Sequence, residues 1–515
     1  MMQTRNTASR PIGFSFLCLC SLTVTSCTVG PDYRRPDMSV PAGFKSATQS
    51  STTTPTTMPT TAPVAALTTD WWRLFGDATL NQLEEDATRA NTDLQAAVAR
   101  VTQARAAARV VRSEFYPVVT LDPSIERART SGNRSTTNGG SGSGTTGGTT
   151  NNTNSNRSST SGGRTSTNVR VPFDLSYEID VWGRVRRSYE ASVAQVRAAQ
   201  DDYQVVLQTL QADVAQNYFN IRSLDSQSQI LRENVESYKK QIELVQTQKR
   251  AGLVGQTDVV QAQTLLNSTI AQEIDIRRQR ADLEHALAVL LGRPPSEITV
   301  TVEPLAIAPP VIPGGLPADL LRRRPDVLRA EQDLVAANAQ VGVATAAFYP
   351  TFRLTGAAGF ESADLRHALD WESRVWSIGP SVSIPIFEGG QLDANLQQVK
   401  ARYEELVATY RGNVLGAYRD VEDSLTDLHL RADAAQAQDL AVQSAREYLR
   451  LSTVQYKGGL ATYLQVIDAE RTLLTNELSA VQILNQRLVS TVLLIKSMGG
   501  GWDPQADSGP RDAVR

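Results

Sequence analysis

The stretch NVRVPFDLSYEIDVW, residues 168–182, alternates between apolar and polar side chains. Its apolar residues occupy the odd positions, Val169, Val171, Phe173, Leu175, Tyr177, Ile179 and Val181. A period of two predicts a strand with one apolar and one polar face. A similar strand is expected at residues 376–386, and weaker alternation predicts partner strands at 118–129 and 351–361.

The four expected strands have about the length that a tilted transmembrane strand needs, ~9–11 residues. Four strands cannot close a barrel, because the smallest known barrels have about eight. Open sheet edges are not tolerated in lipid, so the chain would have to pool its strands with copies of itself. A soluble sandwich would give the same alternation, and it is the alternative for the strands taken alone.

Long helices are expected over most of the remaining chain. One apolar series steps by seven residues from Leu207 to Ile242, and a second runs from Leu210 to Val245, with one interruption in each. A strict heptad repeat predicts a left-handed coiled coil. The helix at 184–249 would be ~100 Å long, which suits a reach across a compartment better than a compact globule. Further helices are expected at 77–114, 256–291, 318–348, 391–457 and 462–498.

The order of elements repeats, which indicates a tandem duplication of α+β class. The motif FYP at 115–117 recurs at 348–350, and TLL at 264–266 recurs at 472–474. A proline-rich segment separates the copies. The expected divisions are a signal peptide at 1–26, a lipidated linker at 27–69, a first repeat at 70–300, an inter-repeat linker at 301–317, a second repeat at 318–498 and a tail at 499–515.

One segment distinguishes the two copies. Residues 131–167 are almost entirely Ser, Gly, Thr and Asn, with three arginines. Such a composition cannot bury a core, so a disordered loop that is dispensable for assembly is expected there.

The N-terminus has the pattern of an export signal. Arg5 and Arg10 precede a short apolar stretch that ends in the sequence VTSC at 24–27, which resembles a bacterial lipobox. Cys27 is therefore predicted to carry the lipid and to begin the mature chain. Ordinary signal cleavage beside an incidental cysteine is the alternative. No segment after Cys27 is predicted to form a transmembrane helix.

Composition argues against several functional classes. The chain has 51 basic and 54 acidic residues, so no basic surplus points to nucleic acid. All three cysteines lie within the first 27 residues, and the three histidines are far apart. No metal or cofactor motif and no convincing catalytic triad is visible, so we expect neither an enzyme nor a bound cofactor.

Several motifs in order resemble the TolC-type outer-membrane factors, in the lipoprotein subgroup represented by OprM and NodT. The motifs are VGPDY at 29–33, WW at 71–72, RRPDV at 323–327, FEGG at 387–390 and VIDAE at 466–470. The resemblance implies a homotrimer that forms one twelve-stranded barrel in the outer membrane and a helical tunnel through the periplasm. It also implies a periplasmic adaptor and an inner-membrane pump, commonly of the resistance-nodulation-division class.

The function implied is a passive duct for small molecules such as drugs. A duct for protein secretion is the main alternative, and a lipid-anchored coiled-coil tether is a weaker one. The resemblance further implies a periplasmic gate at the tunnel tip. The residues that match it are Thr257, Asp258, Tyr456, Gln465 and Asp468, with turn glycines Gly252, Gly458 and Gly459.

Two roles are expected within this gate. The Tyr456 hydroxyl would donate a hydrogen bond to the Asp258 carboxylate and hold neighbouring helix pairs together. Asp468 would contribute one carboxylate per chain to a ring that favours cations. The alternative is that Asp258 caps a helix N-terminus and that Tyr456 and Asp468 are ordinary packed or solvated residues.

Overall fold

The computed structural model describes residues 28–38, 44–45, 69–129, 131, 165–310 and 324–501. Cys27, most of the predicted loop and the end of the inter-repeat linker lie outside the described residues. The chain forms two compact units. The first combines Met1–Pro31, Arg109–Tyr189 and Ala339–Val399, and the second combines Asp32–Ala108, Glu190–Asn338 and Lys400–Arg515.

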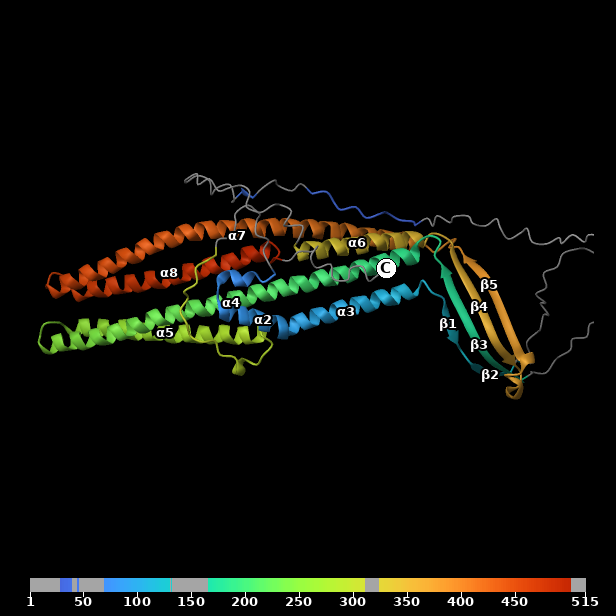
Figure 1. Ribbon diagram of the computed structural model, residues 1–515, viewed down its shortest axis with the longest axis horizontal. Helices are drawn as coiled ribbons and strands as arrows, with labels where there is room; N and C mark the ends of the chain where they lie inside the picture. Colours follow the sequence, from blue (N-terminus) through green and yellow to red (C-terminus); the bar gives the residue numbers. More distant parts are fainter. Residues whose placement is uncertain are drawn as a thin grey trace, which may run out of the picture. The chain divides into compact units, whose positions relative to one another are not determined.

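The first unit contains one antiparallel sheet, in which neighbouring strands lie side by side in the order β1, β3, β4, β5 (Figure 1). The predicted strand at 118–129 is divided into β1 and β2, which pair with successive parts of β3. Pro123 lies at the division and has no N–H to donate. The bounds are β1 Val118–Leu121, β2 Ser124–Arg129, β3 Thr165–Ile179, β4 Thr351–Ser362 and β5 Arg374–Ser383.

The prediction of a disordered loop at 131–167 is wrong for its last three residues, which belong to a strand. Strand β3 begins at Thr165, and residues 165–167 pair with residues 127–129 of β2. Backbone hydrogen bonds form this ladder, and a Ser/Thr-rich sequence can supply them without apolar side chains. The last predicted strand also ends earlier, at Ser383 instead of residue 386.

Each half of the chain contributes one helix of 67 residues followed by one of 35. These are α4 and α5 in the first half, and α7 and α8 in the second. This equality of lengths agrees with the predicted repeat. The helix bounds are η1 Trp71–Phe75, α2 Ala78–Ala90, α3 Thr92–Ser113, α4 Arg184–Arg250, α5 Gln256–Leu290, η2 Pro295–Glu297, α6 Pro325–Ala346, η4 Leu365–His367, η5 Trp371–Ser373, α7 Gln391–Lys457 and α8 Tyr463–Ser497.

The helix predicted at 77–114 is interrupted at Asn91. This residue has an extended backbone, with ψ of 132°. Its side-chain oxygen accepts from the N–H of Leu94 at 2.9 Å, and its amide donates to the carbonyl of Leu290 at 2.9 Å. Asn91 therefore caps α3 and bonds to the end of α5, a contact that local sequence does not predict.

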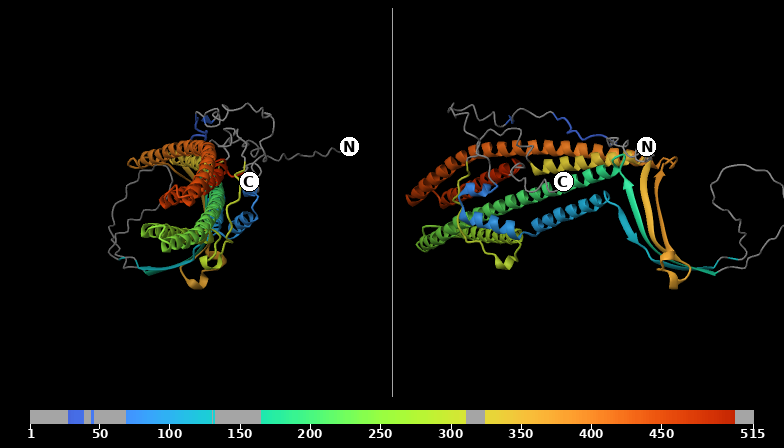
Figure 2. Two further views of the ribbon diagram at one scale, coloured as in Figure 1. Left: turned by 90° about the vertical axis from the view of Figure 1, so that its left-hand side faces the viewer. Right: turned by 45° about the vertical axis from the view of Figure 1, so that its right-hand side comes forward.

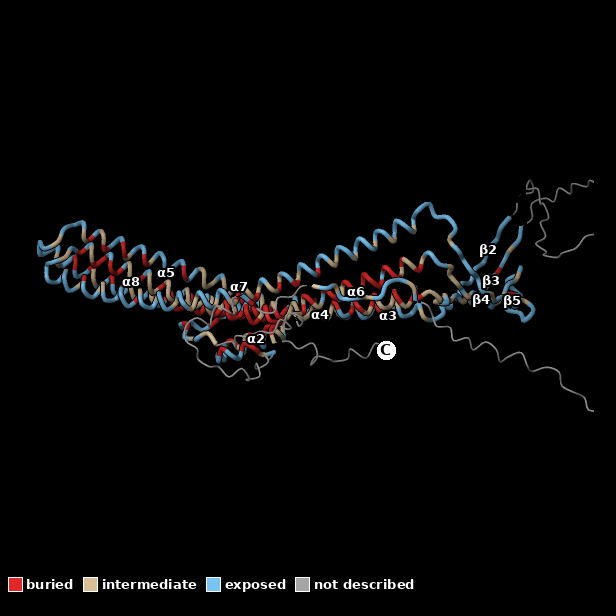
Figure 3. Tube along the Cα trace, turned by 90° about the horizontal axis from the view of Figure 1, so that it is seen from above, coloured by how far each residue is buried: buried red, intermediate tan, exposed pale blue. Residues whose placement is uncertain are grey.

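The main core of the second unit lies where α4, α7 and α8 meet the aromatic segment around η1. Trp71, Tyr218 and Phe219 are almost fully buried there, and Leu488 is completely buried. The Tyr218 hydroxyl donates to Asp77 at 2.5 Å, and the other carboxylate oxygen of Asp77 caps α2. Figure 3 shows the buried residues concentrated beside α2.

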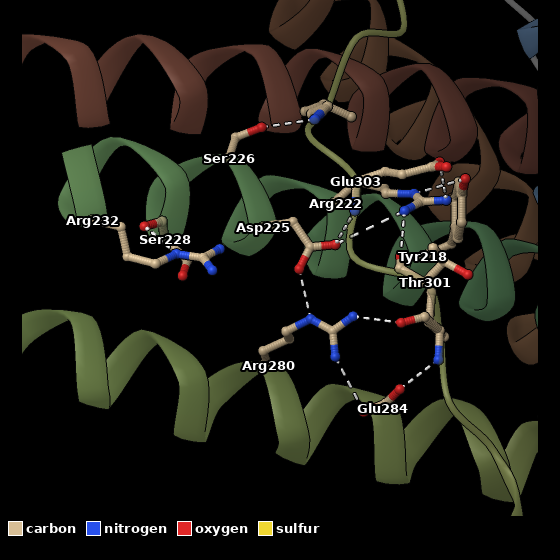
Figure 4. Close-up of polar contacts among 12 residues, drawn as sticks. Tyr218, Arg222, Asp225, Ser226, Ser228, Arg232, Arg280, Glu284, Thr301 and Glu303 are labelled. Atoms are coloured by element: carbon tan, nitrogen blue, oxygen red, sulfur yellow. Dashed lines mark hydrogen bonds and ion pairs between the residues drawn. The ribbon is translucent and has the colours of Figure 1, made fainter.

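A buried polar cluster fixes the linker that follows α5 to α4 and α5 (Figure 4). Arg222 donates to the Thr301 carbonyl at 2.7 Å and forms an ion pair with Glu303 at 3.0 Å. Asp225 accepts from Arg280 at 2.6 Å and from the backbone of Glu303 at 3.2 Å. The side chains of Arg222 and Asp225 are 3% and 1% exposed. We call these five residues the linker clamp.

Helix α8 is, within the described ranges, the one helix that is long and apolar enough to cross a membrane. This finding rests on length and composition alone, so it does not contradict the prediction that no segment after Cys27 forms a transmembrane helix. A core helix has the same composition, and α8 buries Leu488, Val492 and Ile495 completely in the main core. These three side chains of α8 are therefore covered by other parts of the chain.

Candidate functional site

Two turns connect the long helices at the tip of the second unit, one between α4 and α5 and one between α7 and α8 (Figure 2). Gly252 and Gly459 have φ of 73° and 71°, a region that favours glycine. Gly458 does not have a positive φ, contrary to the role expected for it. Its N–H donates to the Val454 carbonyl at 3.0 Å and so continues the helical pattern of α7.

The expected Tyr456–Asp258 hydrogen bond is absent from the contacts of the described chain. A carboxylate oxygen of Asp258 instead accepts from the N–H of Gly255 at 3.1 Å and caps α5. The Tyr456 hydroxyl donates to the side-chain carbonyl of Gln248 in α4 at 2.8 Å. Asp258 is near enough to add to the rise in the pKa of Tyr456, which is caused first by burial. The capping alternative therefore describes Asp258 in this chain.

A second Tyr–Gln pair lies one heptad away. The Tyr463 hydroxyl of α8 donates to the side-chain carbonyl of Gln241 at 3.2 Å. The rings of Tyr456 and Tyr463 contact each other with centroids 5.5 Å apart. Both pairs connect α4 to the α7–α8 hairpin, and we call them the tip latch. Sequence reasoning missed both glutamines and Tyr463, although the glutamines share the seven-residue period of the heptads.

Next to the tip latch lies a buried acid. Glu470 of α8 is 5% exposed and accepts a hydrogen bond from the Gln241 amide. Its other carboxylate oxygen is buried without a hydrogen-bond partner. Burial raises the pKa of Glu470 to about 7, and the bond from Gln241 partly opposes this rise. Glu470 is the last residue of the VIDAE motif, and no role is predicted for it from the sequence.

Asp468, two residues earlier, is outside this buried junction. It is exposed and accepts from the Tyr448 hydroxyl at 3.2 Å. Gln465 is half-buried one turn before it on α8. Asp468 is thus accessible to ions, as a ring residue would have to be.

Thr257 lines a different feature, a cavity of about 730 Å³ between α5 and α8. The cavity is lined by both polar and apolar side chains, among them Thr257, Val260, Gln261, Leu464, Ile467 and Arg471. In the described part of the chain, no group of His, Cys, Asp or Glu side chains is arranged to hold a metal ion.

Comparison with known proteins places these features in a family. The family model described as outer membrane efflux protein matches residues 83–293 and 316–500. The solvent efflux pump outer membrane protein SrpC of Pseudomonas putida is 31% identical over 483 residues, 93% of this chain and 97% of that protein. OprJ of Pseudomonas aeruginosa is 29% identical over 493 residues, 94% of this chain and 95% of that protein.

Solved structures have the same fold. The outer-membrane channel OprN has a TM-score of 0.80 at 30% identity, covering 93% of this chain and 100% of its own. The open-state MtrE channel of Neisseria gonorrhoeae has a TM-score of 0.75 at 27% identity, covering 92% and 98%. The predicted α+β channel fold is confirmed, and this chain belongs to the outer membrane efflux protein family.

Proposed function

We propose that three copies of this chain form an outer-membrane duct through which an efflux pump discharges small toxic compounds. The observation that carries this proposal is the sheet of the first unit. In the described residues, its outer edges, formed by β1–β2 and by β5, have no partner strand. Apolar side chains on these strands are exposed, including Ile125 at 67%, Trp376 at 78% and Ile378 at 66%.

A sheet with exposed apolar side chains suits lipid, but only if its edge strands pair with strands of other chains. Lipid provides no hydrogen-bond partners, so an open sheet would leave its edge N–H and C=O groups unsatisfied. Each chain supplies four strand positions, since β1 and β2 share one. Three chains would therefore supply twelve, an even number within the range of bacterial barrels.

The second unit would form the wall of a tunnel. Helices of 67 residues are about 100 Å long, which suits a passage through the periplasm. We propose a periplasmic adaptor and an inner-membrane pump, of the resistance-nodulation-division class, as its partners. The names of the relatives include solvent, toluene and antibiotic efflux pumps, which favours small apolar cargo over secreted protein.

A duct of this kind needs no catalytic residue and no cofactor, and we propose that the chain has neither activity nor prosthetic group. We propose Cys27 as the lipid anchor, with residues 27–69 as the linker to the first repeat. Several acyl chains would anchor the chain firmly, at ~0.8 kcal/mol per buried CH₂.

We further propose that the tip latch is the gate. Its two hydrogen bonds connect α4 to the α7–α8 hairpin beside the two helix turns. Asp468, exposed on α8, would form the three-carboxylate ring, with Gln465 beside it and Thr257 on the neighbouring α5 surface.

Native mass spectrometry of the membrane-extracted chain tests this assembly. We expect three copies, each beginning at Cys27 with the added mass of its acyl chains. Cells without the gene should accumulate a lipophilic fluorescent dye several-fold, and the wild-type gene should restore efflux. A monomer with an unmodified Cys27, together with unchanged dye accumulation, would contradict the proposal.

A further inference from the structure

The acid at the tip occupies a junction of four helices. The cluster around it combines Tyr238, Ile242 and Val245 of α4, Val259, Ala262 and Leu265 of α5, and Tyr463, Val466 and Ile467 of α8, with Leu449 and Tyr456 of α7 packed against it. Glu470 itself is 5% exposed. An apolar junction of this kind strongly disfavours a charged carboxylate.

Hydrogen bonding in the junction suits the neutral acid. Gln241 joins two groups, because its carbonyl accepts from Tyr463 while its amide donates to Glu470. The second oxygen of Glu470 and the hydroxyl of Tyr238 are both buried without a partner. A carboxylate would be buried as a charge with a single hydrogen bond, which costs more free energy than burying the neutral carboxyl with that bond.

Among the described residues, no cation forms an ion pair with Glu470. The titratable groups that face the junction are Tyr238 from α4, Asp258 from α5, Tyr456 from α7, and Tyr463, Arg471 and Glu477 from α8. Glu477 forms an ion pair with Arg446 at 2.9 Å. Arg471 affects Tyr238, but it does not contribute to the pKa of Glu470, which is set by burial and by the bond from Gln241.

We propose that Glu470 is a proton-binding site that sets how tightly the α7–α8 hairpin is held to α4 at the tip. When protonated, Glu470 completes the junction through Gln241. When ionised, it attracts water and weakens the Gln241–Tyr463 bond of the tip latch. This inference rests on the proposed function, because a looser tip acts as a gate only if the chain forms a duct. In such a duct the gate would open as the pH rises.

The direction of the pH effect follows from linkage. The pKa of Glu470 in the folded chain, about 7, is above the ordinary value of 4.5. The folded junction therefore retains a proton that the opened junction releases. Its stability is complete below about pH 4.5, falls as the pH rises to about 7, and changes little above that value.

Hydrogen–deuterium exchange of the purified full-length protein in detergent tests this inference. Glu470→Gln keeps the shape and an N–H donor but cannot ionise. At pH 8 we expect amides at 238–250 of the wild type to exchange on the order of tenfold or more faster than those of Glu470→Gln, since one pKa unit corresponds to a factor of ten. At pH 4.5, the ordinary pKa of a glutamate, the two proteins should agree within about twofold.

Two further variants keep the result unambiguous. Glu470→Met fills a similar volume without titrating, so it should lose the difference between low and high pH as Glu470→Gln does, although it cannot accept the hydrogen bond from Gln241. Glu243→Gln makes the same change at an exposed position of α4, within the segment whose exchange is followed, and should behave as the wild type. Equal exchange in the wild type and Glu470→Gln at pH 8 would overturn the proposal. Slower exchange in Glu243→Gln, equal to that of Glu470→Gln at pH 8, would also overturn it. Exchange does not require conduction, so the duct and the proton site can fail separately.

Discussion

At the residue scale, the proposed gate depends on two tyrosine hydroxyls. Tyr456 and Tyr463 each present a ring to the apolar junction and an O–H to a glutamine of α4. An aromatic side chain with one polar end suits this position, because the ring is buried while the hydroxyl still finds a partner. Asp258, the residue first expected to receive the Tyr456 bond, serves the cap of its own helix.

Tyr456→Phe should therefore release one contact of the tip latch and keep the ring. A net hydrogen bond contributes about 0.5–1.5 kcal/mol, so the balance between closed and open tips should shift roughly two- to tenfold. Conductance in planar bilayers should rise accordingly. Asp258→Ala is the comparison, and it should not raise conductance, because it removes a helix cap and leaves the Tyr456–Gln248 bond in place. If Asp258→Ala raised the conductance and Tyr456→Phe did not, the result would contradict the tip latch and support a gate in which Tyr456 bonds to Asp258.

The residues of the gate were only partly predictable from sequence. Gly252 and Gly459 were found because a turn between helices requires a positive φ, which is a local property. The partner of Tyr456 depends on the register of α7 against α4, 208 residues away in sequence. The burial of Glu470 on α8 depends on how α4, α5 and α7 pack around it, and the local sequence does not predict this packing.

At the element scale, the linker clamp holds the chain to α4 and α5 between the two repeats. The carbonyls of residues 300 and 301 accept from Arg280 and Arg222. The N–H groups of residues 303 and 305 donate to Asp225 and Ser226. Two arginines share Asp225, whose side chain is 1% exposed. The charges are paired and hydrogen-bonded, which is the condition under which buried ions are tolerated.

Asp225→Ala should destabilise the chain strongly. It leaves Arg222 and Arg280 near an empty position in a buried cluster, and breaking one member of such a group costs about 3–5 kcal/mol. Asp282→Ala removes an exposed ion pair with Arg278 on α5 and should cost less than about 1 kcal/mol. Thermal unfolding followed by far-UV circular dichroism compares the two. Equal shifts in the unfolding midpoint would show that the clamp adds nothing beyond a surface contact.

Element bounds were predictable where the signal was local. Helix α7 begins and ends at the predicted residues, Gln391 and Lys457, because glycines flank both ends. The division at Asn91 was missed, since the Asn91 amide bonds to Leu290, 199 residues away. The start of β3 was missed because its Ser/Thr-rich end forms a ladder without apolar side chains.

At the scale of the whole molecule, the two halves repeat the same order of strand and helix, with equal lengths of 67 and 35 residues. This repetition gives one chain four strand positions and two helix pairs. The number of chains was not visible in the fold of one chain. That more than one chain is needed follows from the sheet edges, which have no partner strand among the described residues, and from the requirement that lipid places on such edges.

Single-channel recording in planar bilayers tests the central claim that this chain is a conducting duct. Purified wild-type protein should give discrete conductance steps with a reversal potential that favours cations. Asp468→Ala should keep the steps but lose most of that preference, because the exposed carboxylate ring is removed. The absence of conductance steps from folded trimers of the wild type and of Tyr456→Phe would contradict the account.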